Sequence, residues 1–313
     1  GLLYKKQKKT ELAEKYFLET IKKDSNYSKA YNGLAIFYED QKQPDLAEKY
    51  YLKAIAKKPD YIDAINSLGV LYYNNKKYPD AEKYYYSALK LDSNYSSAMH
   101  NLGLLYYNQP KPDLQKAENF MRRAISKNPF FAKSHYTLAL IHEDRLLYPE
   151  AEKELLEAIR LDSGYTSAYN TLGLLYKNQK KPEKAETYFR KALQSDSNFS
   201  YAYFNLGAIA SGRNDNALAI KYYLKAVEKK PDYADALNSL GVLNYSGKNY
   251  PVAEKYYKQA LQVDSNYYLA MYNLGLLYYY QPKTDYPNAE RYLRRAISKN
   301  PSDSKSHYLL SLV

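Results

Sequence analysis

The sequence predicts an all-α protein, with about nine antiparallel helix pairs forming one continuous array over residues 1–313. Three observations support this prediction: a repeat of about 34 residues, helical spacing of the apolar positions, and proline and turn residues at the expected helix boundaries. The chain has 45% hydrophobic and 26% charged residues, which is the balance of a folded protein rather than a disordered one.

A Leu-Gly dipeptide marks the repeat. Its glycines are 34 residues apart, or 70 where Ala139 takes the place of one of them. They are Gly69, Gly103, Gly173, Gly207, Gly241 and Gly275. An alanine follows in the second half of each unit, and the units that hold Ala117 and Ala289 are two residues longer. A fixed period of this length indicates a repeat array rather than a set of ordinary domains.

Each unit is predicted to contain two helices. In one unit the apolar residues at helical spacing are Tyr31, Leu34, Ala35 and Tyr38, followed by Ala47, Tyr51, Ala54 and Ile55. Proline stands where most second helices begin, as at Pro44 and Pro79, because the missing N–H costs nothing there. The units close on "KKPDY" or "DSNY", which are turn and N-cap sequences.

These residues resemble the tetratricopeptide repeat (TPR) family, whose pattern is an aromatic residue, Leu-Gly, Tyr, Ala, a second aromatic residue and Pro. One unit contains Tyr169, Leu172, Gly173, Tyr176, Ala185, Phe189 and Ala192. The chain departs from the pattern in having no Trp. The resemblance covers essentially the whole chain. It implies a right-handed α-solenoid, the TPR superhelix, in which the first helix of each unit lines a concave groove.

Glycine and tyrosine have expected structural roles in such an array. A glycine inside a helix costs about 0.5–1 kcal/mol relative to alanine, so we expect close approach of the two helices of a unit at these positions. The chain has 41 tyrosines. Tyr72 and Tyr85 fall on core places of the motif, and we expect the hydroxyls to reach the edge of a thin two-layer core.

A longer period lies within the short one. "YYLKA" at residue 50 recurs at 222, and "RRAISKNP" at 122 recurs at 294, each 172 residues later. We therefore expect an internal duplication, with blocks 1–172 and 173–313. Both termini fall inside a unit, which predicts a fragment cut within repeats at both ends. Head-to-tail self-association would cover the apolar side chains of Leu3, Tyr4 and Phe17 at one end and of Leu309, Leu310 and Val313 at the other.

No chemistry-bearing motif is visible, so we expect neither an enzyme nor a cofactor nor a metal site. The chain has no cysteine, which excludes disulfides, thiolate catalysis and zinc ribbons. His135 and His142 lie seven residues apart on one helix face, but both fall on core places of the motif, which favours packing over a shared metal. No apolar run approaches a membrane helix, so we expect a soluble chain without membrane insertion, the cytoplasm being the favoured compartment.

The family resemblance implies which side chains line the concave groove. They are Asn32, Asn66, Tyr73, His100, Asn101, Tyr107, Asn108, Tyr136, Asn170, Asn178, Asn205, Asn238, Asn273 and Tyr279. Between them runs an aliphatic line: Ile36, Val70, Leu104, Leu140, Leu174, Val242 and Leu276. An asparagine amide both donates to and accepts from a passing backbone, as in the similar asparagine ladder of O-linked N-acetylglucosamine transferases. The alternative is that these asparagines are merely tolerated wall residues.

The sequence therefore predicts a non-enzymatic protein–protein interaction scaffold that binds an extended peptide or partner protein in the groove. Two alternatives are a self-assembling array that uses its open ends and a targeting module of a larger enzyme. The lysine of a carboxylate clamp is absent from the inner row, which disfavours acidic chaperone tails. The net charge of +12 also invites a nucleic-acid partner, but the lysine pairs fall at turns and helix ends, so this is less favoured. No small-molecule substrate is expected.

Overall fold

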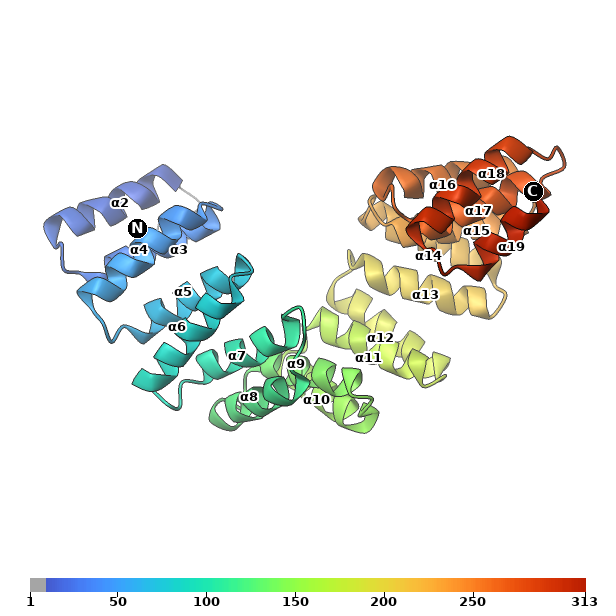
Figure 1. Cartoon of the computed structure of the whole chain (residues 1–313). Coiled ribbons are helices and arrows are strands. Elements are labelled where there is room, and N and C mark those ends of the chain that lie inside the picture. Colours follow the sequence, from blue (N-terminus) through green and yellow to red (C-terminus); the bar gives the residue numbers. More distant parts are fainter. Residues whose placement is uncertain (1–9) are drawn as a thin grey trace. The chain divides into compact units, whose positions relative to one another are not determined.

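A computed structural model describes residues 10–313, and over this range the chain forms helices α2 to α19 and no strand (Figure 1). The all-α prediction is confirmed for this range. Leu3 and Tyr4, which we expected to be exposed apolar residues, lie outside the described residues. Phe17 and Leu309 were expected to be exposed as well, but both are buried, Phe17 because its ring packs against Gly33 of the next helix. Eight complete helix pairs, α3/α4 to α17/α18, stand between α2 and α19, in agreement with the expected number of about nine.

Two compact units divide the chain. The first spans residues 1–162, and its helices are α2 (Thr10–Lys23), α3 (Ser28–Asp40), α4 (Pro44–Lys57), α5 (Ile62–Asn74), α6 (Tyr78–Leu91), α7 (Ser96–Asn108), α8 (Leu114–Lys127), α9 (Ala132–Asp144) and α10 (Tyr148–Leu161). Odd-numbered helices are the first helices of their pairs, and even-numbered helices are the second. The predicted duplication into blocks 1–172 and 173–313 stays a prediction.

The second unit spans residues 163–313. Its helices are α11 (Thr166–Asn178), α12 (Pro182–Ser195), α13 (Ser200–Gly212), α14 (Asn216–Lys229), α15 (Ala234–Ser246), α16 (Tyr250–Val263), α17 (Tyr268–Tyr280), α18 (Tyr286–Lys299) and α19 (Ser304–Leu312). First helices are 13 residues long where complete, and second helices are 14.

The turn inside a pair has a recurring backbone conformation. A non-glycine residue adopts a positive φ near 60° just after the first helix. These residues are Lys42, Lys76, Leu146, Lys180, Asn214 and Lys248. The second helix then begins with proline in its first turn in most pairs, or with an aspartate cap such as Asp113, whose side chain accepts from the Lys116 N–H at 3.0 Å. The predicted helix starts are confirmed.

The repeated glycines lie where the ring or apolar side chain of the second helix meets the first. A Cβ on Gly69 would stand 2.7 Å from Cε1 of Tyr85, and one on Gly241 would stand 2.4 Å from Cε1 of Tyr257. Real Cβ atoms do not approach that closely, so only glycine lets these buried rings lie flat on the first helix. The expected close approach within each pair is therefore confirmed.

A recurring tyrosine connects each of several pairs to the preceding pair. The Tyr72 ring is buried and stacks on Tyr84 at 5.4 Å and 21°, while its hydroxyl donates to Glu48 Oε1 at 2.9 Å. The same bond joins Tyr38 to Glu14 (2.6 Å), Tyr106 to Glu82 (2.5 Å) and Tyr278 to Glu254 (2.7 Å). We call these four bonds the tyrosine–glutamate seam. They explain the use of tyrosine rather than leucine, since the hydroxyl reaches a carboxylate at the edge of the core.

Histidine occupies the seam position in α9. His142 Nε2 lies 3.4 Å from Glu118 Oε1 of the preceding pair, and Arg122 and Arg145 also bond to Glu118. Burial, together with the charge of Arg122, lowers the pKa of His142. His135 is buried too, with Nδ1 2.6 Å from Glu154 Oε2; burial alone would lower its pKa, but the bond to Glu154 raises it. Both histidines are packed core residues, as expected.

Candidate functional site

The first helices form the inner wall of each unit. First helices of successive pairs approach each other closely, as α5 approaches α7 in the first unit and α15 approaches α17 in the second. Second helices of successive pairs do not come as close within the described residues. A stack of pairs therefore curves with its first helices on the shorter side. All of the predicted groove residues lie on these first helices.

Six of the predicted asparagines bond to one another in pairs across adjacent first helices. Asn101 Nδ2 donates to Asn66 Oδ1 at 3.0 Å, between α7 and α5. The two other amide pairs are Asn205 to Asn170 (3.1 Å) and Asn273 to Asn238 (2.9 Å). The partners in each pair are 35 residues apart, so they come from successive repeats. The amides therefore join neighbouring repeats, which the sequence analysis did not anticipate.

The amide pairs use part of the hydrogen-bonding capacity that we assigned to a partner. Asn170, Asn205 and Asn238 are buried, whereas Asn66, Asn101 and Asn273 are partly exposed. Each pair occupies one amide oxygen and one N–H, so an accessible asparagine keeps further donor or acceptor sites. Asn108 and Asn178 are exposed at the ends of α7 and α11, and Asn108 Nδ2 donates to the carbonyl of Leu104 at 3.1 Å.

Asn32 on α3 lies in the same row but has no paired amide. Its Oδ1 is buried and has no hydrogen-bond partner among the described residues. The residue of α5 that corresponds to Asn101 is Ser67, which is shorter and bonds to the Tyr51 hydroxyl. An amide pair thus forms only where both successive repeats supply asparagine.

His100 was expected to face the groove, but the residue is buried, with only 9% of its surface exposed. A hydrogen bond of 3.0 Å joins His100 Nδ1 to Ser134 Oγ, and the Phe131 ring meets it edge-on at 5.1 Å. Burial and the nearby Lys133 charge lower the pKa of His100 to about 4. The ring is therefore neutral at pH 7 and joins α7 to α9.

The predicted groove tyrosines are half-buried. Tyr73 meets Tyr78 at 5.9 Å, and Tyr279 meets Tyr286 at 6.1 Å. Burial and a hydrogen bond to Asp144 raise the pKa of Tyr107, and Tyr136 lies near enough to contribute. Beside these rings the aliphatic line is partly exposed, most at Val242 with 39%. The accessible surface therefore combines apolar side chains, phenol rings and some amides.

Sequence reasoning missed an aromatic cluster between α13 and the turn just before α15. The Tyr201 ring lies 5.4 Å from Tyr233, which lies 5.0 Å from Phe204. Lys230 Nζ donates to the Tyr201 hydroxyl at 3.0 Å and stands 5.0 Å above the Tyr233 ring. The signal in the sequence was the aromatic residue just before nearly every first helix, which we treated only as part of a turn.

Many basic side chains of the second helices and turns lie over aromatic rings. Lys53 stands 5.3 Å from the Tyr50 centroid and Lys191 stands 4.9 Å from that of Tyr188. These cation–π contacts give the basic residues a structural role on the second helices. The positive net charge thus gives no support to nucleic-acid binding in the groove.

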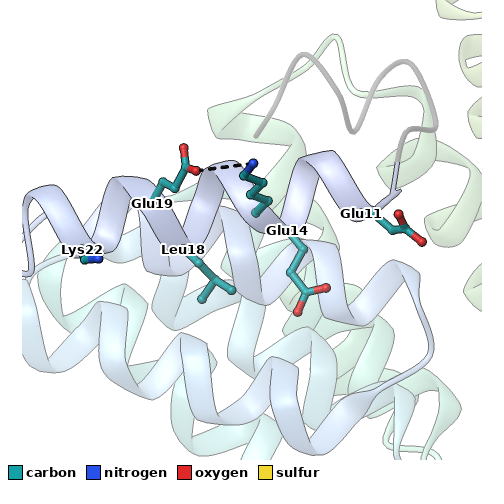
Figure 2. Close-up of a pocket in the computed structure, with 6 residues that line it drawn as sticks. Glu11, Glu14, Leu18, Glu19 and Lys22 are labelled. Atoms are coloured by element: carbon teal, nitrogen blue, oxygen red, sulfur yellow. Dashed lines mark ion pairs between the residues drawn. The ribbon is translucent and has the colours of Figure 1, made fainter.

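The cavities found along α2 and α16 do not coincide with the inner wall. A cavity of about 430 Å³ lies along α2 and is lined by Glu11, Glu14, Lys15, Leu18, Glu19 and Lys22 (Figure 2). Another of about 520 Å³ uses the equivalent positions of α16. Both belong to second helices and are lined mainly by polar side chains, so neither supplies a ligand site. Over residues 10–313 there is no cluster of His, Cys, Asp and Glu that could hold a metal, and no helix has the length and apolarity needed to cross a membrane.

Comparison with sequence families identifies the repeats. Profiles of the tetratricopeptide repeat match residues 1–62 and 204–268, and residues 62–95 and 166–199. The chain is a tetratricopeptide repeat protein. The related Sel1 repeat matches residues 96–129 and 269–301, the segments that contain the two longer repeats. TPR arrays are protein–protein interaction scaffolds and are generally not enzymes. A comparison with curated proteins finds no match.

Solved structures of other TPR proteins share the fold. The APC/C hetero-tetramer Cut9–Hcn1 is similar with a TM-score of 0.64 and 16% identity, over 96% of this TPR chain and 58% of that one. PilF of Pseudomonas aeruginosa is similar with a TM-score of 0.61 and 21% identity, over 71% of this chain and 99% of that one. At these identities the similarity supports the solenoid fold and carries no information on partners.

Proposed function

We propose that the chain holds an extended segment of a partner protein along the inner wall of first helices. The observation that carries the proposal is the composition of this wall, where partly exposed Val70, Leu104 and Leu276 alternate with half-buried tyrosines and paired amides. The aliphatic and phenol groups would supply apolar contact, and the remaining amide groups would bond to a backbone without selecting its sequence.

The amide pairs give this wall a fixed shape. Because each pair ties two successive first helices, the aliphatic and aromatic side chains beside it are held in place before a ligand arrives. Preorganisation of this kind lowers the ordering cost of binding. The pairs would therefore contribute to affinity even where the amides themselves are buried.

A display library of random twelve-residue peptides tests the proposal. The parent chain should enrich a peptide family, and the variant with Asn66, Asn101, Asn170 and Asn205 all changed to Ala should recover it poorly. Both members of two amide pairs are removed together, so no buried amide is left unpaired and helicity should be retained. Circular dichroism checks the fold of the variant.

The matched control changes second-helix residues instead. Leu52→Ala with Leu156→Ala alters two side chains that are each 41% exposed on α4 and α10. This variant should recover the same peptides as the parent. Failure of the parent to enrich any peptide, or equal recovery by the amide variant, would contradict a groove function. Self-association through the chain ends stays a separate prediction, which light scattering over a concentration series tests.

A further inference from the structure

The inner surface of α5 and α7 recurs on α15 and α17. Site A consists of Asp63, Asn66, Val70, Tyr73, Asn101 and Leu104. Site B consists of Asp235, Asn238, Val242, Tyr245, Asn273 and Leu276, each 172 residues later and identical to its counterpart. Each site lies within one compact unit, since site A belongs to the first and site B to the second.

The contacts of the two sites agree as well as the residues. The amide pairs are 3.0 Å long in site A and 2.9 Å in site B. The Tyr95 hydroxyl donates to Asp63 Oδ1 at 2.8 Å, and Tyr267 donates to Asp235 Oδ1 at 2.6 Å. Tyr73 meets its neighbour ring at 5.9 Å and 61°, and Tyr245 does so at 5.7 Å and 66°. The chain thus carries one arrangement of groups twice.

A sequence duplication does not by itself account for this agreement. The first helices α3 and α13 are related by the same 172 residues, and their core leucines Leu34 and Leu206 agree. Their inner-wall residues nevertheless differ: Lys29 against Tyr201, Asn32 against Phe204, and Glu39 against Ser211. The inner-wall residues therefore differ between α3 and α13, whereas the residues of site A on α5 and α7 are the same as those of site B on α15 and α17. This difference points to a shared role for sites A and B.

The charge of the two sites indicates the chemistry of the partner. The aspartate is exposed and is the only charged member of each site, within a chain whose net charge is +12. Lys230, outside site B, is close enough to Asp235 for their charges to interact. Because Tyr95 bonds to Oδ1 of Asp63, a ligand cation would meet Oδ2. The aliphatic pair, Val70 and Leu104 in site A, offers an apolar surface beside this carboxylate. A lysine or arginine next to an apolar residue on an extended segment complements both features.

We propose that sites A and B bind the same short motif, so that one chain holds two copies of an extended segment in which a basic residue neighbours an apolar one. This inference rests on the proposed function and specifies its ligand and stoichiometry. Residues at the border differ, with His100 beside site A and Tyr272 beside site B, so the two affinities differ while the motif is shared.

Variants that block one site at a time test the proposal. Leu104→Arg blocks site A and Leu276→Arg blocks site B, while Leu52→Arg and Leu224→Arg place the same charge on second helices, where the leucines are 41% and 44% exposed. The random twelve-residue display library is selected on every variant, and the enriched peptide is synthesised and titrated by calorimetry. Circular dichroism melts verify that each variant folds as its control does.

The two blocked variants should enrich the same motif, with lysine or arginine beside an apolar residue. The parent and both controls should bind two equivalents of the synthetic peptide, and each blocked variant should bind one. The double variant, Leu104→Arg with Leu276→Arg, should show no measurable binding. Asp63→Asn with Asp235→Asn keeps the shape of both sites and should weaken binding about two- to fivefold, the effect of an exposed ion pair, with a smaller dependence on salt.

Unrelated motifs on the two blocked variants, or a single equivalent on the parent, would overturn the duplicated site while leaving groove binding intact. Binding unchanged by the two aspartate substitutions would overturn the basic-residue assignment. Absence of any enriched peptide on the parent would instead reject the proposed function itself.

Discussion

Removing one hydroxyl from the tyrosine–glutamate seam should measurably destabilise the folded array. Tyr72→Phe keeps the buried ring, its stack on Tyr84 at 5.4 Å and the packing between helices, and removes the 2.9 Å bond to Glu48 together with the hydroxyl interaction with Tyr84. Hydrogen bonds to charged groups contribute about 1.5–3 kcal/mol, but Glu48 is partly exposed and regains water when the bond is lost. We therefore expect Tyr72→Phe to lower the free energy of unfolding by about 1–2 kcal/mol.

Urea denaturation followed by circular dichroism measures this loss. Glu48→Ala, alone and with Tyr72→Phe, completes a double-mutant cycle, and the coupling between the two sites should account for most of the Tyr72→Phe effect. Tyr27→Phe is the matched control, because its ring is exposed and lies outside the seam; its effect should stay below about 0.5 kcal/mol. Equal stability of Tyr72→Phe and Tyr27→Phe would refute the assignment of the seam as a link between repeats.

Three further predictions concern the core, a buried histidine and a turn. Leu172→Ala should lower the free energy of unfolding by about 2–5 kcal/mol because it truncates a core side chain. Gly173→Leu should lower it by about 1–3 kcal/mol or more, since a Cβ at residue 173 meets the Phe189 ring. Thermal melts of the two variants that match the parent would reject both predictions. The pKa of His100 is about 4 in the folded chain and about 6.5 in the unfolded chain. As the pH falls below 6.5, the unfolded chain binds a proton at this histidine before the folded chain does, so the free energy of unfolding falls by up to about 3 kcal/mol toward pH 4. His100→Gln should therefore lose less stability than the parent between pH 7 and pH 4.5. Lys180→Gly should stabilise by about 0.5–1 kcal/mol because Lys180 has φ 57°, and thermal melts that show a loss would contradict this.

Sequence periodicity was sufficient to predict the helix pairs and the contact of Gly69 with the second helix, because both depend on spacing within one repeat. It did not predict that Asn101 bonds to Asn66, or that Tyr72 reaches Glu48. Those bonds depend on how one pair is placed on the next, a rotation and translation that local spacing does not encode. The recurrent Ala-Glu dipeptide of the second helices, as at Ala47–Glu48, was the available signal for the seam.

The same limit applies to the candidate site. The family resemblance placed the predicted residues on first helices, and all of them lie on first helices in the structure, while their role in binding stays a prediction. It did not distinguish buried amides such as Asn205 from exposed ones such as Asn178, because burial depends on the neighbouring repeat. The acidic residue Asp63 also went unnoticed, since its meaning became visible only through its bond to Tyr95 and the matching bond at Asp235.

Hydrogen exchange measured by mass spectrometry tests the inner-wall proposal most directly. The chain is compared alone and saturated with the peptide enriched from the display library. The proposal predicts slower exchange in the first helices α5, α7, α15 and α17, with the second helices α4, α6, α14 and α16 changed little. Protection confined to the second helices, or spread evenly over both helices of every pair, would contradict binding at the inner wall.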